Sequence, residues 1–150
     1  MSSFESTEFF KVDLPMGWED QTVYVFNGPD QDGMQHSIMI TIDRQLRHET
    51  IASFAREKTD PLVDGLQGVD VLKDEETTIP GGNPAWEFVY KWVPSEDSLI
   101  MQKYVFVIKD NMGFAISAKF SRKSYKTVGL QLPKIIESLL PGTYEPLEAD

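Results

Sequence analysis

Ser37-Ile38-Met39-Ile40-Thr41-Ile42-Asp43 is the stretch of sequence that decides the fold. Because successive side chains of a β-strand point to opposite faces, the three isoleucines share one face, and Ser37, Met39 and Thr41 share the other. A strand that met only water on its second face would carry charged residues there. The stretch therefore predicts a strand with one fully apolar face and a second face that is small, weakly polar and uncharged.

Further strands flank this one, separated by turns rich in glycine, proline and aspartate. Short turns between neighbouring strands indicate an antiparallel sheet. One of these turns, Asp30-Gln31-Asp32-Gly33, is similar to the start of a calcium loop, but the closing glutamate is missing, so a hairpin turn is favoured. The other expected strands are 8–14, 21–27, 69–79, 85–93, 99–109 and 114–120.

Two segments change from the period of a strand to that of a helix. The second of them, 124–140, is predicted to be helical in spite of Pro133. The first, 48–68, has a candidate N-cap in Thr50 and contains Pro61, which is expected to kink it. Its apolar residues recur at helical spacing: Ile51, Phe54, Ala55, Leu62 and Leu66.

The order of these elements is β-β-β-α-β-β-β-β-α, which indicates an α+β fold. The sheet is expected to be antiparallel and to have both helices over one of its faces. We find no repeat and no linker, so residues 1–150 are expected to form a single domain, with 141–150 as a short C-terminal tail.

Composition narrows the classes of function. Of the 150 residues, 24 are acidic and 14 basic, giving a net charge of −10, which argues against nucleic acid and anionic membrane surfaces as partners. There is no cysteine, which excludes disulfides, thiolate metal sites and a cysteine nucleophile. No apolar run is long enough for membrane insertion, and the first residues lack the pattern of a signal peptide. A cytoplasmic location is therefore expected.

The sequence contains no catalytic motif that we recognise. A glycine-rich phosphate loop, G-x-S-x-G and H-E-x-x-H are all absent. His36 and His48 have no carboxylate at ligand spacing, so surface or capping roles are predicted for both. Neither an enzyme nor a metal or cofactor site is expected. Two charged runs are interpreted as a solvated strand end and as charge balance on a helix: Asp74-Glu75-Glu76, and Lys119, Arg122, Lys123, Lys126 and Lys134.

The second face of the sheet is harder to explain. In strand 21–27, Tyr24 and Phe26 lie on one face, while Val23 and Val25 lie on the other, so both faces are apolar. A sheet that is apolar or weakly polar on both sides requires a second covering partner. Loops of the same chain, a dimer interface and a bound ligand all remain open at this point.

The segment Leu14-Pro15-Met16-Gly17-Trp18-Glu19-Asp20-Gln21-Thr22-Val23 resembles the opening of DcrB-related proteins. More narrowly, it is similar to the effector-associated (Eag) chaperones of bacterial type VI secretion. The resemblance implies a Mog1/PsbP-like α+β fold and a homodimer. It also implies binding of the N-terminal transmembrane helices of secreted effectors, generally near a PAAR domain, before export. Four further features support it: the isoleucine strand, Asp43-Arg44, the loop Gly82-Asn83-Pro84-Ala85, and Met101-Gln102-Lys103.

The resemblance also implies a groove for such helices, with an aliphatic floor and scattered small polar groups. Leu62 and Leu66 would form its wall or a dimer contact, although a plain core role is also open. Met101 and Gln102 point to opposite faces of their strand, so only one of them can line it. Lys58 and Leu62 stand where the family tends to have polar residues. The implied cargo-binding residues are Val23, Val25, Ser37, Met39, Thr41, Leu62, Leu66, Met101 and Gln102.

The function expected is therefore that of a dimeric, non-catalytic chaperone. A membrane-spanning helix is about 30 Å long, whereas a six-residue strand spans about 20 Å, so two copies shield a helix better than one. Two other classes remain as alternatives. One is a binding or regulatory module of the Mog1 type that recognises a folded partner through its sheet. The other is a hydrolase that uses the acidic loops.

Overall fold

The computed structural model describes residues 2–6, 11–18, 21–31, 34–44, 50–65, 68–79, 81–95 and 98–141. The strands are β1 (Ser2–Ser6), β2 (Lys11–Pro15), β3 (Thr22–Gln31), β4 (Met34–Asp43), β5 (Asp70–Thr78), β6 (Pro84–Ser95), β7 (Ser98–Lys109) and β8 (Met112–Ser121). The helices are α1 (Ile51–Gly65), α2 (Arg122–Tyr125), the 3-10 helix η1 (Val128–Gln131) and α3 (Leu132–Ser138).

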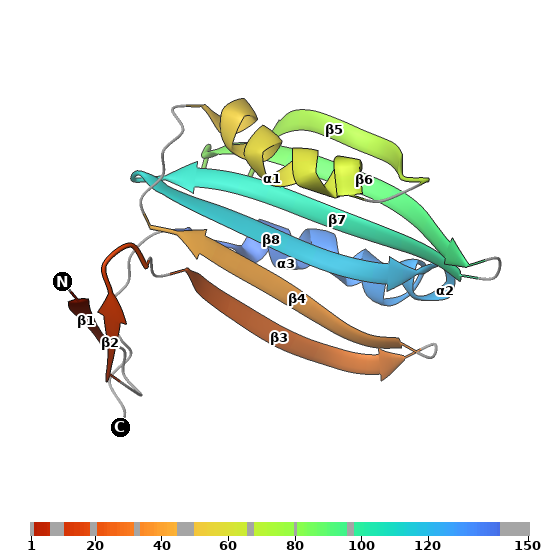
Figure 1. The fold of residues 1–150 in the computed structure, drawn as a ribbon. Helices are drawn as coiled ribbons and strands as arrows, with labels where there is room; N and C mark the ends of the chain where they lie inside the picture. Colours follow the sequence, from red (N-terminus) through yellow and green to blue (C-terminus); the bar gives the residue numbers. More distant parts are fainter. Residues whose placement is uncertain are drawn as a thin grey trace, which may run out of the picture.

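Six strands form one antiparallel sheet in the order β3-β4-β8-β7-β6-β5 (Figure 1). The predicted α+β fold with an antiparallel sheet is confirmed. The strand expected at 8–14 is found as β2, and it pairs with β1, which the sequence did not predict. These two strands form a separate sheet beside the larger one. The turn between β7 and β8 has positive φ at Asp110 and Asn111, as a two-residue hairpin turn requires.

The helices lie on opposite faces of the sheet, which corrects the prediction that both cover one face. In Figure 1, α1 crosses in front of β6 and β7, and α3 lies behind the sheet. The reason is that β6, β7 and β8 are apolar on both sides. Phe88 and Phe106 point toward α1, whereas Val105 and Val107 point toward the C-terminal helices, so each face needs its own cover.

Two cores result, one on each side of the sheet. The larger lies under η1 and α3 and includes Ile116, Leu132 and Ile136, with the isoleucines of β4 packed against it. The smaller, the α1 core, consists of Ile51, Phe54, Ala55, Phe88, Tyr90 and Phe106. The isoleucine face of β4 therefore meets helices as predicted, and its other face looks toward the side of α1.

His36 is buried, with 4% of its surface exposed, so the surface or capping role predicted for it is wrong. It continues the isoleucine face of β4, because alternate residues of a strand share a face. Its ring lies 6.1 Å from the ring of Phe120, centroid to centroid. His48, Leu66, residues 32–33 of the expected turn and residues 142–150 of the expected tail lie outside the described residues.

The single helix expected over 124–140 is in fact three short helices. Ser121 and Ser124 start α2 with a reciprocal capping box, in which each backbone N–H donates to the other hydroxyl. The chain leaves helical geometry at Thr127. Pro133 then stands in the first turn of α3, where its missing N–H has no helical partner to lose.

The α1 core should set the stability of the fold. Phe106 is 1% exposed and its ring meets that of Phe54 at 5.8 Å, so Phe106→Ala should lower the free energy of unfolding by about 3–5 kcal/mol. Val93→Ala, at a site that is 53% exposed, is the control and should cost less than about 0.5 kcal/mol. Equilibrium denaturation with urea measures both. Equal losses would contradict this assignment of the core.

Candidate functional site

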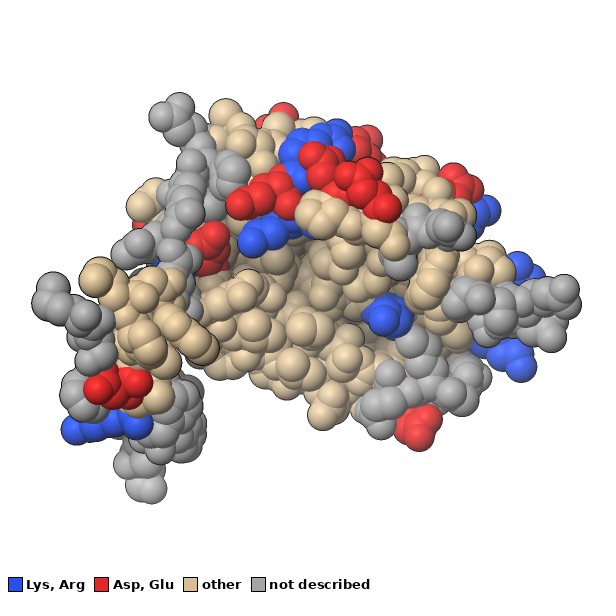
Figure 2. Space-filling view, viewed as in Figure 1, with Lys and Arg blue, Asp and Glu red and all other residues tan. Residues whose placement is uncertain are grey.

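One half of the sheet face that carries α1 has no helix over it among the described residues. Helix α1 packs on β6 and β7, and leaves β8, β4 and β3 uncovered on the same side. Figure 2, in the same view, shows charged side chains gathered over α1 and β5. Below that ridge is a broad and almost uncharged surface over β7, β8 and β4. We call this surface the trough.

The pairing register fixes which side chains form the floor of the trough. Ala115 packs against the α1 core, so its partner Thr41 lies on the same face, and so do the alternate residues of β4. The cross-strand rows are Val23–Thr41–Ala115, Val25–Met39–Ser117–Tyr104, and, at the end of the trough, Asn27–Ser37 and Lys119–Gln102.

Large apolar side chains on this floor are exposed to solvent. Val23 is 43% exposed, Val25 54% and Met39 42%. Between them lie small residues that are half-buried, among them Thr41 and Ser117. An exposed, contiguous apolar surface of this kind marks an interaction site more often than it marks plain surface.

The structure brings five of the sequence-predicted groove residues together on this floor: Val23, Val25, Ser37, Met39 and Thr41. Gln102 joins them, and Met101 does not, because it pairs with Phe120 and points to the opposite face. Leu62 is half-buried and packs against the α1 core, as a core residue would. A cargo-binding role for these residues stays a prediction.

The floor also contains residues that the sequence did not single out: Asn27, Tyr104, Ala115, Ser117 and Lys119. The signal was present in β8, where Ala115, Ser117 and Lys119 alternate with Phe114, Ile116 and Phe120. This is the same alternation of small or polar residues with large apolar ones that singled out β4.

The side of the trough that borders α1 contains a short chain of hydrogen bonds between side chains. The hydroxyl of Tyr90 donates to Oε1 of Gln102 over 2.6 Å, and Nε2 of Gln102 donates to the hydroxyl of Tyr104 over 2.8 Å. The Tyr104 ring also stacks on that of Phe106, 5.8 Å away. Burial raises the pKa of Tyr104 to about 12 and also raises the pKa of Tyr90, so both hydroxyls remain protonated near neutral pH.

The wall of the trough is α1, which is fixed to the sheet at several points. Nη1 of Arg56 lies 2.7 Å from Oδ2 of Asp74 on β5, and Nε1 of Trp86 donates to Oδ1 of Asp74 over 2.6 Å. The guanidinium also lies 5.7 Å from the centroid of the Trp86 ring. Thr50 caps α1 as predicted, accepting the Ser53 N–H over 3.1 Å. Asp74 is therefore an anchor for α1, and not the solvated strand end that was expected.

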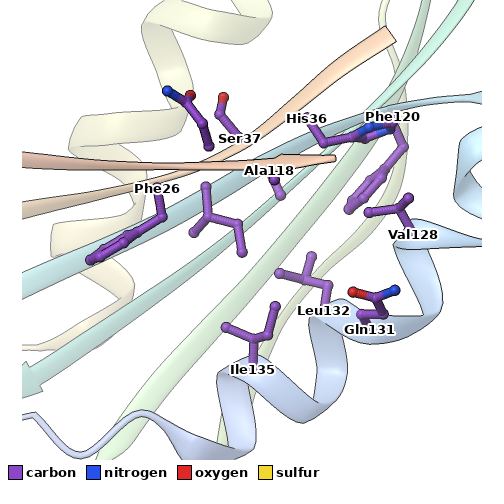
Figure 3. Close-up of a pocket in the computed structure, with 12 residues that line it drawn as sticks. Phe26, His36, Ser37, Ala118, Phe120, Val128, Gln131, Leu132 and Ile135 are labelled. Carbon is purple, nitrogen blue, oxygen red and sulfur yellow. The ribbon is translucent and has the colours of Figure 1, made fainter. Parts of the chain in front are cut away.

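A separate pocket of about 200 Å³ lies on the other side of the sheet, between the β3–β4 hairpin and α3 (Figure 3). In Figure 3, Leu132 and Ile135 face it from the helix, while Ser37 points away from it. Since Ser37 is on the trough face of β4, the pocket and the trough are on opposite faces of the sheet.

A sequence profile of the DcrB family matches residues 11–136. The chain belongs to the DcrB family. No curated protein matches this sequence. Two solved structures share its fold. PA94 from Pseudomonas aeruginosa, a protein of unknown function and candidate regulator, is 17% identical with a TM-score of 0.71, covering 95% of this chain and 99% of its own. LpqN from Mycobacterium tuberculosis, involved in cell envelope biogenesis, is 14% identical with a TM-score of 0.50, covering 77% and 67%.

At these identities the two structures show that the DcrB-family chain shares their fold, and no more. Within the described parts of the chain, no three His, Cys, Asp or Glu side chains gather as ligands for a metal ion. None of the helices in those parts is long and apolar enough to cross a membrane.

The burial of the Tyr104 hydroxyl makes a prediction about pH. An exposed tyrosine ionises near pH 10, whereas folded Tyr104 ionises at about 12, so between these values the folded chain keeps a proton that the unfolded chain has lost. The free energy of unfolding should therefore fall as the pH rises from about 10 to about 12. Tyr104→Phe should reduce this fall. In a titration that follows tyrosinate absorbance against pH, the variant should lack the ionisation step near pH 12. An unchanged titration in the variant would contradict it.

Proposed function

We propose that this protein is a chaperone that binds the hydrophobic N-terminal helices of a type VI secretion effector, near its PAAR domain, and shields them before export. The observation that carries the proposal is the trough. It offers an exposed aliphatic floor beside a wall, α1, that is anchored by Arg56, Asp74 and Trp86. Such a surface suits an apolar ligand that would otherwise enter a membrane or aggregate. The proposal includes no catalytic step.

The composition of the floor favours a membrane helix over other apolar ligands. Helices in membranes associate through small residues, which let backbones approach, and through side-chain hydroxyls and amides that add hydrogen bonds. Ala115, Ser117 and Thr41 supply the small residues of the floor, and Gln102 supplies an amide held in place by two tyrosines. Met39, which is flexible, can adapt to helices of different sequence.

The dimensions favour two copies of the chain around the cargo. From Ser37 to Asp43 the trough runs along six residue steps of β4, or about 20 Å. A membrane-spanning helix of about 20 residues is about 30 Å long. One trough therefore leaves part of such a helix exposed, and a homodimer with two troughs would cover it.

The net charge of −10 fits a chaperone of the cytoplasm, where we expect the protein to act. An acidic surface keeps a complex soluble and repels it from anionic lipid headgroups, so the cargo would be kept out of the inner membrane. Membership of the DcrB family is compatible with a binding role, and the type VI cargo rests on the narrower resemblance noted in the sequence.

Val25→Asp tests the trough directly. A helix of about 20 leucines and alanines, fused to a soluble reporter, is co-expressed with the chaperone and recovered by affinity purification. The variant should recover at least about tenfold less reporter, because an unpaired carboxylate would be buried against an apolar helix. Val93→Asp is the matched control, since Val93 is as exposed as Val25 but lies in β6, outside the trough. Equal recovery by both variants, with native circular dichroism, would contradict the proposal.

Light scattering of the purified protein tests whether the chain forms the proposed homodimer. The mass should correspond to two chains of 17.1 kDa, and to two chains with one helix fusion after loading. A single chain that retains one fusion would show that one trough is sufficient. A complex that forms only with a folded domain, and never with the apolar helix, would favour the alternative of a module for folded partners.

A further inference from the structure

Two basic side chains face the trough of this strongly acidic protein. We infer that the trough selects apolar helices that carry an acidic side chain, which pairs with Lys119 on the floor, while Lys58 on the wall adds a second positive charge to the same trough. This inference rests on the proposed function and deepens it, because it names the chemistry by which one apolar helix is preferred to another.

Lys119 is placed on the floor by its neighbours. Ala118 and Phe120 are each 4% exposed and belong to the core under α3, so the side chain of Lys119 points the other way, into the trough. It stands opposite Gln102 and is exposed. The role in charge balance on a helix that was expected for Lys119 is wrong, because Lys119 lies on β8.

Lys58 is placed on the wall by the anchor of α1. Arg56 reaches Asp74 on β5, which fixes the flank of α1 that faces away from the trough. Lys58 follows two residues later, about 200° around the helix, and therefore lies on the flank toward β8. It is half-buried, and its Nζ lies 5.9 Å from the centroid of the Phe54 ring.

Within the described residues, neither lysine of the trough has an acidic partner. Ion pairs there are instead formed by Arg56, Lys73, Lys91 and Lys103, among other cations. A lysine beside a bound apolar helix loses hydration, which is unfavourable unless a counter-charge arrives with the ligand. An aspartate or glutamate on the bound helix supplies that charge. Burying an acidic side chain in a lipid bilayer is energetically unfavourable. The trough would therefore favour helices that insert poorly into a membrane.

The test uses three reporter fusions that differ at one central position of the same leucine–alanine helix: Asp, Asn or Lys. The wild-type dimer should bind the Asp helix about tenfold more tightly than the Asn helix, and the Lys helix least tightly. Lys119→Glu should reverse this order in favour of the Lys helix. Lys134→Glu is the control, because it makes the same charge change on α3, on the opposite face of the sheet, and should leave the order unchanged.

The outcomes separate this inference from the function on which it rests. If no helix binds, the chaperone proposal fails. If all three helices bind wild type equally, the chaperone proposal stands and the inference is overturned. Lys119→Met, which keeps the aliphatic stem without the charge, should bind the Asp and Asn helices equally. A retained preference for Asp in that variant would show that Lys119 is not the partner. If Lys119→Glu does not fold, the wild-type order and Lys119→Met still decide.

Discussion

An α-helix with its side chains is about 10–12 Å across, whereas neighbouring strands lie about 4.8 Å apart, so one helix covers only two or three strands. The trough depends on this constraint. Helix α1 is the one described helix on its face of a six-stranded sheet, and it packs on β6 and β7 near one edge. The other face receives η1 and α3 over the isoleucines of β4. What remains is a half-sheet of aliphatic and small polar residues that this part of the chain leaves open.

The position of α1 is fixed by polar contacts at its outer flank and by apolar contacts beneath it. The Arg56–Asp74–Trp86 contacts hold the flank toward β5, and Phe54 meets Phe106 edge to face below. Charged side chains gather over α1 and β5, next to the almost uncharged surface of the trough (Figure 2). This segregation lets a strongly acidic protein keep an apolar surface beside the charged one.

Most of what could be predicted came from the alternation of side chains along the strands. The alternation in β4 correctly put Ser37, Met39 and Thr41 on one face, because a two-residue period leaves no other choice. The periodicity of a helix does not show on which face of the sheet that helix packs. It could not show that α1 and α3 lie on opposite faces, or decide between Met101 and Gln102. Both questions depend on contacts between residues far apart in sequence, such as Thr41 with Ala115 and Gln102 with Tyr90. His36 was misjudged because histidine as a residue type outweighed its place on the isoleucine face.

Strand β3 is at the edge of the sheet and has β4 as its one neighbour in the sheet order. In the part of the chain that the structure describes, no strand pairs with its outer edge along Val23–Asn27, up to the bulge between Asn27 and Asp30, beyond which regular pairing is interrupted. That regular half is the half whose valines form part of the floor. A strand added there would widen the apolar floor by one strand, about 4.8 Å, without altering any residue already in it.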